Sequence, residues 1–281
     1  MNRIILTILL SGIFLNCCAG PKTNKEAGDG DENSLIFTNR TFANQNLSEL
    51  MRKTDGRSII RLEFQRCTFQ GATGLSTLLN AYQNFPCGLF FRECTFEGSL
   101  SLQSVSFTGQ VDFHKCAFKK DLIARNAVFI APFGLRECGI DGEAAFQNCI
   151  FMKESTWIGS YFYGVSLFQG SRFMKPAQFQ NVHFQANGDF TQCRFEEGAI
   201  YDFCIAQGKL DLSESRQDGL MTFKKSQLQK GLQMNRFRSF ALLKFFETRF
   251  DDSLRIREFR YFAEKPELVN PIGSVIPSGG F

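Results

Sequence analysis

Large apolar residues recur along this sequence in alternating steps of five and six positions, so that the pattern repeats at every eleventh position. The unbroken centre of the run is Phe146, Phe151, Trp157, Phe162, Phe168, Phe173, Phe179, Phe184, Phe190 and Phe195. A smaller residue lies two positions before most of these sites, as Cys94 does before Phe96. Positions i−2 and i of an extended segment point to one side, and the residue between them points away. Each unit therefore predicts a short extended face followed by a corner.

A face of this length cannot fold alone and must stack on copies of itself. Two faces per turn would leave no room between opposed Phe rings, so we expect four faces and a square coil that closes one turn every twenty-two positions. The sequence holds 33 Phe but 5 Tyr and 1 Trp, which suits a repeated interior position because Phe has no polar tip. Identical residues recur at this spacing, as stacked parallel strands require: Phe107, Phe129, Phe151, Phe173 and Phe195; Phe146, Phe168 and Phe190; Cys94, Cys116 and Cys138.

Three units show the pattern most clearly: AAFQNCIFMKE (residues 144–154), AQFQNVHFQAN (177–187) and GDFTQCRFEEG (188–198). They resemble the pentapeptide-repeat family, in a Phe-rich form with alternating spacing of five and six. The resemblance covers roughly residues 58–262 and implies an all-β fold, a right-handed quadrilateral parallel β-helix. It brings no catalytic residue and no cofactor with it. The commoner form of the family has Leu and strict steps of five.

The register is interrupted in three places. Residues 72–87 lengthen one turn, and the helical spacing of Leu75, Leu78, Leu79 and Tyr82 predicts a helical excursion. Residues 35–57 are expected to form an N-terminal cap with a short helix, which the capping box from Asn46 to Glu49 would open. Residues 263–281 are expected to form an irregular C-terminal tail. Local slips in register are expected where large apolar positions hold other residues: Ala206, Gln217 and Ser239.

The segment from Met1 to Cys18 resembles a bacterial lipoprotein-type signal. A positive charge at Arg3 precedes an apolar run from Ile4 to Leu15, which suits a signal peptide and is too short to span a bilayer. The run is followed by Cys17 and Cys18, one of which would be acylated. Residues 19–34 are polar and are expected to form a flexible tether. This interpretation places the protein in the cell envelope, anchored to a membrane by lipid; an ordinary cleaved signal peptide is the alternative.

Other chemistry-bearing residues have simpler structural explanations. The repeated Cys positions hold Ala, Val or Ser in other units, so they are expected to need small size and not a disulfide or a metal. His114 and His183 lie next to interior positions and are expected to point outward. Four carboxylates on the flanks of the coil could pair as acid and base, but no motif supports them: Asp141, Glu143, Glu196 and Glu197.

The C-terminal third is basic, with eleven Lys and Arg against five Asp and Glu from Lys224 to Lys265. A possible binding face for anionic lipid, lipopolysaccharide or an acidic protein holds Arg236, Arg238, Arg255, Arg257 and Arg260. The net charge of only +4 indicates no nucleic-acid partner. We therefore expect a non-catalytic envelope scaffold that binds another macromolecule.

Two alternatives remain at this stage. A DNA-mimicking topoisomerase modulator, a function found among pentapeptide-repeat proteins, would need an acidic surface and a cytoplasmic location. A polysaccharide-active β-helix enzyme would need a catalytic site that the sequence does not display.

Overall fold

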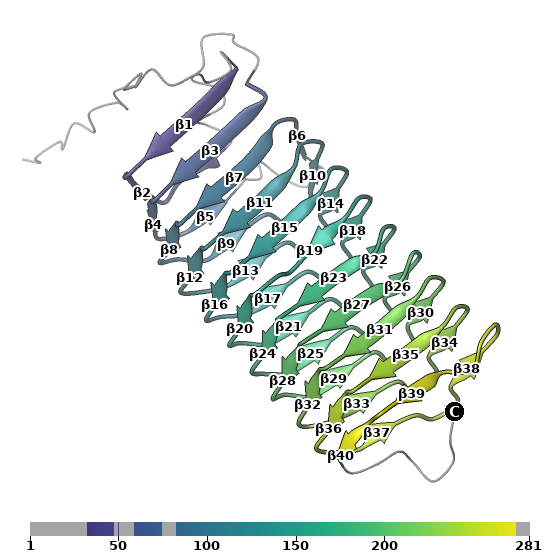
Figure 1. Ribbon diagram of the computed structural model, residues 1–281. Coiled ribbons are helices and arrows are strands. Elements are labelled where there is room, and N and C mark those ends of the chain that lie inside the picture. The colour runs from purple at the N-terminus through teal and green to yellow at the C-terminus, as the bar shows by residue number, and fades with distance from the viewer. Residues whose placement is uncertain (1–32, 48–49, 51–58, 75–82, 274–281) are drawn as a thin grey trace, which may run out of the picture. The chain divides into compact units, whose positions relative to one another are not determined.

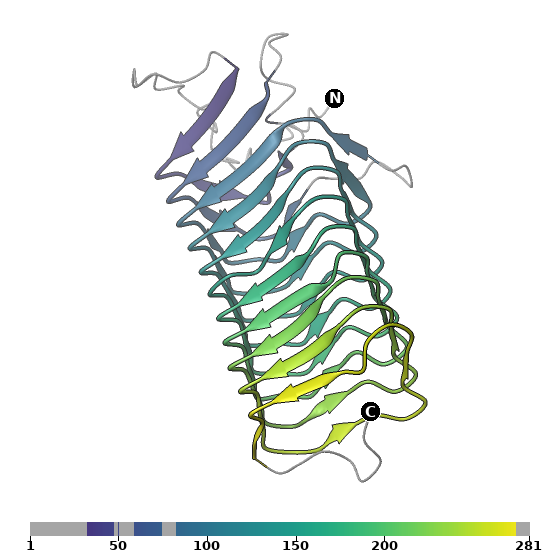
Figure 2. The ribbon, with the colours of Figure 1, turned by 45° about the vertical axis from the view of Figure 1, so that its right-hand side comes forward.

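The computed structural model describes residues 33–47, 50, 59–74 and 83–273. The chain divides into two units, Met1–Glu32 and Asn33–Phe281, and all described residues belong to the second. These residues wind into a coil of short parallel strands that form four sheets of 11, 11, 9 and 9 strands (Figures 1 and 2). The all-β, four-sided fold predicted from the 5/6 spacing is confirmed.

We name the sheets A to D in the order in which the chain enters them. Sheet A comprises β1 (Ser34–Thr38), β3 (Arg61–Gln65), β7 (Gly88–Arg92), β11 (Val111–His114), β15 (Phe133–Arg136), β19 (Ser155–Thr156), β23 (Ala177–Gln180), β27 (Ala199–Asp202), β31 (Met221–Lys224), β35 (Leu243–Phe246) and β39 (Glu267–Val269). Sheet B comprises β2 (Thr41–Ala43), β4 (Thr68–Gln70), β8 (Thr95–Phe96), β12 (Ala117–Phe118), β16 (Gly139–Ile140), β20 (Tyr161–Phe162), β24 (His183–Phe184), β28 (Ile205–Ala206), β32 (Gln227–Leu228), β36 (Arg249–Phe250) and β40 (Ile272–Gly273).

The other two sheets lie on the remaining sides of the coil. Sheet C comprises β5 (Thr73–Gly74), β9 (Leu100–Ser101), β13 (Leu122–Ile123), β17 (Ala144–Ala145), β21 (Ser166–Leu167), β25 (Gly188–Asp189), β29 (Leu210–Asp211), β33 (Leu232–Gln233) and β37 (Leu254–Arg255). Sheet D comprises β6 (Gln83–Phe85), β10 (Val105–Phe107), β14 (Val128–Phe129), β18 (Ile150–Phe151), β22 (Arg172–Phe173), β26 (Arg194–Phe195), β30 (Arg216–Gln217), β34 (Arg238–Ser239) and β38 (Arg260–Tyr261).

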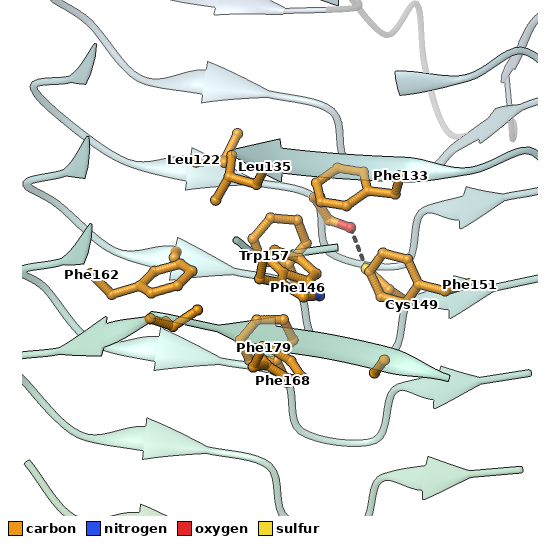
Figure 3. Packing of buried hydrophobic residues seen from close by; sticks show 14 of the residues in the cluster. Leu122, Phe133, Leu135, Phe146, Cys149, Phe151, Trp157, Phe162, Phe168 and Phe179 are labelled. Atoms are coloured by element: carbon orange, nitrogen blue, oxygen red, sulfur yellow. Dashed lines mark hydrogen bonds between the residues drawn. The ribbon is translucent and has the colours of Figure 1, made fainter. Parts of the chain in front are cut away.

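The interior is filled by ladders of stacked rings. In sheet D, the rings of Phe107, Phe129, Phe151, Phe173 and Phe195 have centroid distances of 4.9 to 5.1 Å between neighbours. Side chains from successive faces of one turn meet in the middle of the coil, as Figure 3 shows around Trp157. The columns predicted from the spacing are therefore real ladders, because each member pairs in register with the next.

The alternation of five and six has a backbone cause. The five-residue steps, from sheet A to B and from C to D, each pass through one left-handed residue, such as Lys115 (φ 55°) or Asn126 (φ 59°). Most of these corner residues are not glycine, although the left-handed region costs L-residues roughly 1–2 kcal/mol. The stacked interior therefore imposes the corner, and the corner turns its side chain out of the coil.

The small interior position also has a hydrogen-bonding role. Cys149 Sγ donates to the carbonyl of Ala124 at 2.9 Å (Figure 3), and Ser171 Oγ donates to that of Phe146 at 2.5 Å. The Ser171 hydroxyl also accepts from the Cys149 N–H at 2.9 Å, so these side chains link successive turns. The prediction that these positions require only a small side chain is therefore incomplete, because Cys and Ser also supply a hydrogen-bond donor that Ala and Val lack.

The coil extends further at both ends than residues 58–262. Strands β1 and β2 pair with β3 and β4, so the first part of the predicted cap at 35–57 is a turn of the coil. The pairing joins Ser34 to Arg61, a longer step than in the later turns, which hid these strands from the regular spacing. At the other end β39 and β40 pair with β35 and β36, so the predicted irregular tail at 263–281 begins with two strands.

The two predicted helices fall largely on residues that the structure does not describe. Leu47 and Leu50 are helical and buried, and the rest of the predicted cap helix lies outside the described residues. The predicted excursion at 72–87 is narrower than expected, because β5 and β6 within it belong to the coil and only residues 75–82 lie outside the description.

The expectation of local slips in register is wrong. Ala206, Gln217 and Ser239 pair in register with the residues one turn earlier, and all three are buried. Near Ser239 the missing volume is supplied two positions earlier by Phe237, which is fully buried. The backbone ladder therefore tolerates a small or polar side chain when a neighbouring position compensates.

Candidate functional site

A column of five arginines runs along the outer side of sheet D. Neighbouring members pair in register on strands β22, β26, β30, β34 and β38, so each stands about 4.8 Å above the last. Guanidinium groups at this spacing repel one another, and the repulsion favours anions placed between them. We call this set the arginine column: Arg172, Arg194, Arg216, Arg238 and Arg260.

The first three members, which we call the closed rungs, are ion-paired with two carboxylates of the chain itself. Glu196 contacts Arg172 at 2.5 Å and Arg194 at 3.5 Å. Asp218 contacts Arg194 at 3.4 Å and Arg216 at 2.6 Å. Each carboxylate thus bridges two successive arginines.

The last two members, which we call the open rungs, are Arg238 and Arg260. Both are exposed, and within the described part of the chain neither has a carboxylate partner. The positions that would hold the next two bridging acids are occupied by Phe240 and Phe262, whose rings stack at 4.4 Å. The Arg216 guanidinium lies over the Phe240 ring at 4.0 Å. The column therefore changes from an ion-paired surface to cations beside an aromatic surface.

A groove of 590 Å³ follows the open rungs. One wall is formed by Arg238, Arg260 and the two Phe rings, and the other by corner residues between sheets C and D. Arg236 on that wall is paired with Glu214, whereas Glu258 is exposed and has no ion pair among the described residues. Because Glu214, Arg236 and Glu258 are left-handed corner residues, their side chains leave the coil beside the column.

Three of the five predicted arginines meet at this groove. Arg236, Arg238 and Arg260 line it. Arg255 lies instead on β37 of sheet C, where its Nε donates to Ser253 Oγ at 3.0 Å, and Arg257 lies in the following corner. Sequence reasoning missed the closed rungs and the aromatic pair, although the spacing of one turn applied to outward positions would have found them: Arg172, Arg194, Arg216, Phe240 and Phe262.

Elsewhere on the outer faces several arginines are ion-paired with acids of the chain. Arg136 donates twice to the buried carboxylate of Asp112, both times at 2.8 Å. Burial alone would raise the pKa of Glu63, but its hydrogen bonds from Gln65 and Arg61 outweigh burial and lower the pKa. These acids hold their arginines in place, whereas Arg238 and Arg260 have no acid partner among the described residues.

The four carboxylates considered as a catalytic pair lie at different edges of the coil, and each is ion-paired with a Lys or Arg. Asp141 follows a strand of sheet B and pairs with Lys119, whereas Glu196 follows a strand of sheet D. Glu143 and Glu197 are ion-paired with Arg125 and Lys175, respectively.

The two histidines lie on different sheets. His114 in sheet A is 3.5 Å from Glu137, and His183 in sheet B packs against the Tyr161 ring. In the described ranges no three Cys, His, Asp or Glu side chains cluster in a way that could bind a metal.

The interior cysteines are buried free thiols at all eight described positions. Burial raises the pKa of the Cys149 and Cys204 thiols to about 12 in both cases. A thiol with so high a pKa is a poor nucleophile, because the thiolate is the reactive form. Cys17 and Cys18, the predicted acylation sites, lie outside the described residues. Over the described ranges, no helix is both long enough and apolar enough to cross a bilayer.

Comparison with known proteins agrees with the geometry. The model of a family described as pentapeptide repeats (9 copies) matches residues 91–139 and 168–216. Together with the four parallel sheets, this match shows that the coil is similar to the solenoids of pentapeptide-repeat proteins. No curated protein and no solved structure matches the chain. The matched segments include the closed rungs, and the open rungs follow them in the sequence.

Proposed function

We propose that this protein is a rigid, non-catalytic rod that binds an anionic macromolecular partner through the open rungs of its arginine column. The observation that carries the proposal is the contrast within the column, because two acids pair with Arg172, Arg194 and Arg216, whereas Arg238 and Arg260 stand beside a groove with no acid partner among the described residues. Exposed arginines in a row favour bidentate recognition of carboxylate or phosphate.

The body of the coil suits a scaffold. Each buried Phe contributes roughly 1.5–3 kcal/mol, and the rings stack over many turns. Solenoids of pentapeptide repeats are generally non-catalytic. A stiff ladder presents a linear binding surface whose rungs keep their spacing before the partner arrives, which reduces the entropy lost on binding.

The lipid anchor is the second part of the proposal. An acyl group on Cys17 or Cys18 would hold the solenoid at a membrane of the cell envelope, with the polar residues 19–34 as a spacer. This location, and a basic binding face in place of an acidic one, favour an envelope scaffold over a DNA-mimicking topoisomerase modulator.

Binding to anionic probes tests the main claim. The full chain is titrated with a poly-glutamate peptide, with heparin and with phosphatidylglycerol vesicles at low and physiological salt. We expect at least one probe to bind, and the Arg238→Gln, Arg260→Gln variant to lose about tenfold or more in affinity. The matched control is Arg172→Gln, which removes a charge from the closed rungs and should leave affinity nearly unchanged. Equal losses in both variants, or no binding by the wild type, would refute the claim.

Mass spectrometry of protein extracted from membranes tests the anchor. We expect a diacylglycerol-type adduct on the peptide that begins at Cys17 or Cys18, and loss of membrane association when both are replaced by Ser. An unmodified chain in the soluble fraction would show that the anchor is absent and would leave the binding claim to its own test.

A further inference from the structure

The closed rungs show how this face of the coil binds carboxylates. Glu196 lies between Arg172 and Arg194, and Asp218 lies between Arg194 and Arg216. Each acid comes from the position directly after the interior residue of its strand, so the acids form a second column beside the arginines. One carboxylate per gap is the arrangement that the chain itself uses.

The open rungs keep the arginines of this arrangement and replace the acids. In the next two gaps, the positions of the bridging acids hold Phe240 and Phe262. Phe262 is 56% exposed, and its ring continues the stack of Phe240. Exposed aromatic rings beside arginines are typical of the centre of a protein-binding surface. A ligand that completes the pattern has to bring its own carboxylates and an apolar group that covers the rings.

Carboxylates in the opposite wall narrow the class of ligand further. Glu258 is exposed without an ion pair among the described residues, and Glu214 is engaged by Arg236 and by Gln192, whose Nε2 donates to it at 3.0 Å. A uniform polyanion such as heparin or nucleic acid would face repulsion from these groups. A polypeptide combines carboxylates with apolar side chains and with backbone N–H groups that can donate to Glu258.

We propose that the groove along the open rungs binds an acidic, apolar peptide segment of a partner protein. In this complex the peptide's carboxylates lie at the gaps beside Arg238 and Arg260, and its apolar side chains cover the Phe240 and Phe262 rings. The proposal rests on the proposed function and names the partner class for the same site. The open rungs would attract an anionic lipid surface as well, so it is the Phe240 and Phe262 rings and the exposed Glu258 in the walls of the groove that favour a peptide partner.

The test compares ligands on the full chain. The probes are a fluorescent peptide of Glu, Asp, Leu and Phe, a poly-glutamate peptide of equal length and charge, heparin, and phosphatidylglycerol vesicles. The mixed peptide is expected to bind about tenfold or more tightly than poly-glutamate, because only the former covers the rings. The Phe240→Ala, Phe262→Ala variant is expected to remove this preference and keep the weaker binding of poly-glutamate.

A second pair of variants separates charge from the loss of the rings. Phe240→Asp with Phe262→Asp would extend the column of Glu196 and Asp218 and neutralise the open rungs, so binding of poly-glutamate should fall about tenfold or more. The matched Phe240→Asn, Phe262→Asn variant has side chains of the same shape without the charge, and it should keep the affinity of the wild type for poly-glutamate. All of these changes replace exposed or half-exposed rings, and thermal unfolding verifies that the variants keep the coil. Equal losses in the two variants would overturn the placement of the peptide's carboxylates in these gaps.

Each other outcome identifies which claim has failed. Equal affinity for the two peptides overturns the peptide proposal and leaves the anion-binding function intact. Binding of heparin or vesicles alone does the same and assigns the open rungs to a polyanion or a lipid surface. Absence of binding to every anionic probe overturns the peptide proposal and the proposed function together.

Discussion

The two halves of sheet D differ in which side of the strand carries the aromatic ring. From Phe107 to Phe195 the rings point inward and stack, and the outward position that follows Phe195 holds the acid Glu196. From Gln217 onward the inward positions turn polar, while Phe240 and Phe262 stack on the outside. The strands pair in the same register throughout. A solenoid can therefore gain a binding surface by changing side chains without changing its backbone.

Specific contacts hold the polar interior of the second half. Gln217 Nε2 donates to the carbonyls of Ala241 at 3.0 Å and Leu242 at 2.9 Å. Ser239 Oγ donates to the Ala241 carbonyl at 2.8 Å. Phe237, which occupies a position that is small elsewhere, fills the interior and stacks on Phe259 at 5.6 Å. The exchange is thus compensated in volume, and the Gln217 amide nitrogen and the Ser239 hydroxyl have acceptors, whereas Gln217 Oε1 is buried without a partner among the described residues.

The largest expected effect tests this compensation. Phe237→Ala removes a buried ring beside the small Ser239 and should lower the free energy of unfolding by about 3–5 kcal/mol. Phe240→Ala removes a ring from the outer surface and should cost under about 1 kcal/mol, mainly through its contact with Arg216. Denaturant unfolding of both variants measures the difference. Similar costs would mean that the interior of the second half is not packed around Phe237.

The second prediction uses the buried thiols, because the position that holds Cys149 in the first half of sheet D holds Phe237 in the second. Burial raises the pKa of Cys149 to about 12 from the ordinary value of 9.0, so the folded state holds its proton where the unfolded chain loses it. Stability is therefore complete below pH 9 and falls as the pH rises from 9 toward 12. The loss should approach roughly 1.4 kcal/mol per buried thiol for each pH unit in that window.

Serine variants identify the groups responsible for this loss. Cys149→Ser and Cys204→Ser place at these positions the residue that the chain uses at Ser171 and Ser226, and they keep a donor for the carbonyl of the previous turn. Unfolding midpoints at pH 7 and pH 10 should converge in the double variant relative to the wild type. An unchanged pH dependence would assign the effect to other groups, such as Tyr201, whose pKa burial also raises.

The third prediction concerns the polar interior position. Gln217→Leu keeps a similar volume and removes the hydrogen bonds from Nε2 to the carbonyls of Ala241 and Leu242. Because Ser239 Oγ and the Met221 N–H still donate to these carbonyls, the expected cost is about 0.5–1.5 kcal/mol. The comparison is with the Phe interior of the first half, where Phe173→Leu should lower the free energy of unfolding through lost packing alone, because the ring makes no hydrogen bond. If Gln217→Leu stabilises the protein instead, the hydrogen bonds of the polar interior are not needed for the stability of the fold.

The fold was predictable because one spacing rule determines it. The position of each inward Phe in the alternating five- and six-residue spacing assigns it to one of the four faces. The four sheets and the ladders of Phe and Cys could therefore be predicted directly from the sequence. The spacing rule did not predict strands β1 and β2. The first turns are longer than the later ones, which shifts Phe37 and Phe42 out of phase with the rest of the pattern. The hydrogen bonds made by the Cys side chains were also not predicted, because the spacing indicates the size of a side chain and not the carbonyl to which it donates.

The candidate site was only partly predictable. The excess of basic residues in the C-terminal third predicted a binding face that correctly includes Arg236, Arg238 and Arg260. The same prediction included Arg255 and Arg257, which lie away from the groove. The decisive contrast between closed and open rungs needs the register of the second column, because an arginine is neutralised by an acid on its own strand or on the next turn. Outward positions hold varied residues, so no single composition rule singles them out.

The smallest expected effect opens a rung that is now closed. Glu196→Gln keeps the shape of the side chain and removes the charge that bridges Arg172 and Arg194. The pairs are partly exposed, so the free energy of unfolding should fall by only about 0.2–1 kcal/mol. Affinity for the poly-glutamate probe should rise a few-fold, because Arg172 loses its acid and Arg194 keeps only its 3.4 Å contact with Asp218 in the same column. The matched control is Glu197→Gln, which frees a lysine outside the column and should leave affinity unchanged. A gain in the control equal to that of Glu196→Gln would mean that net charge, and not the spacing of the arginine column, governs binding.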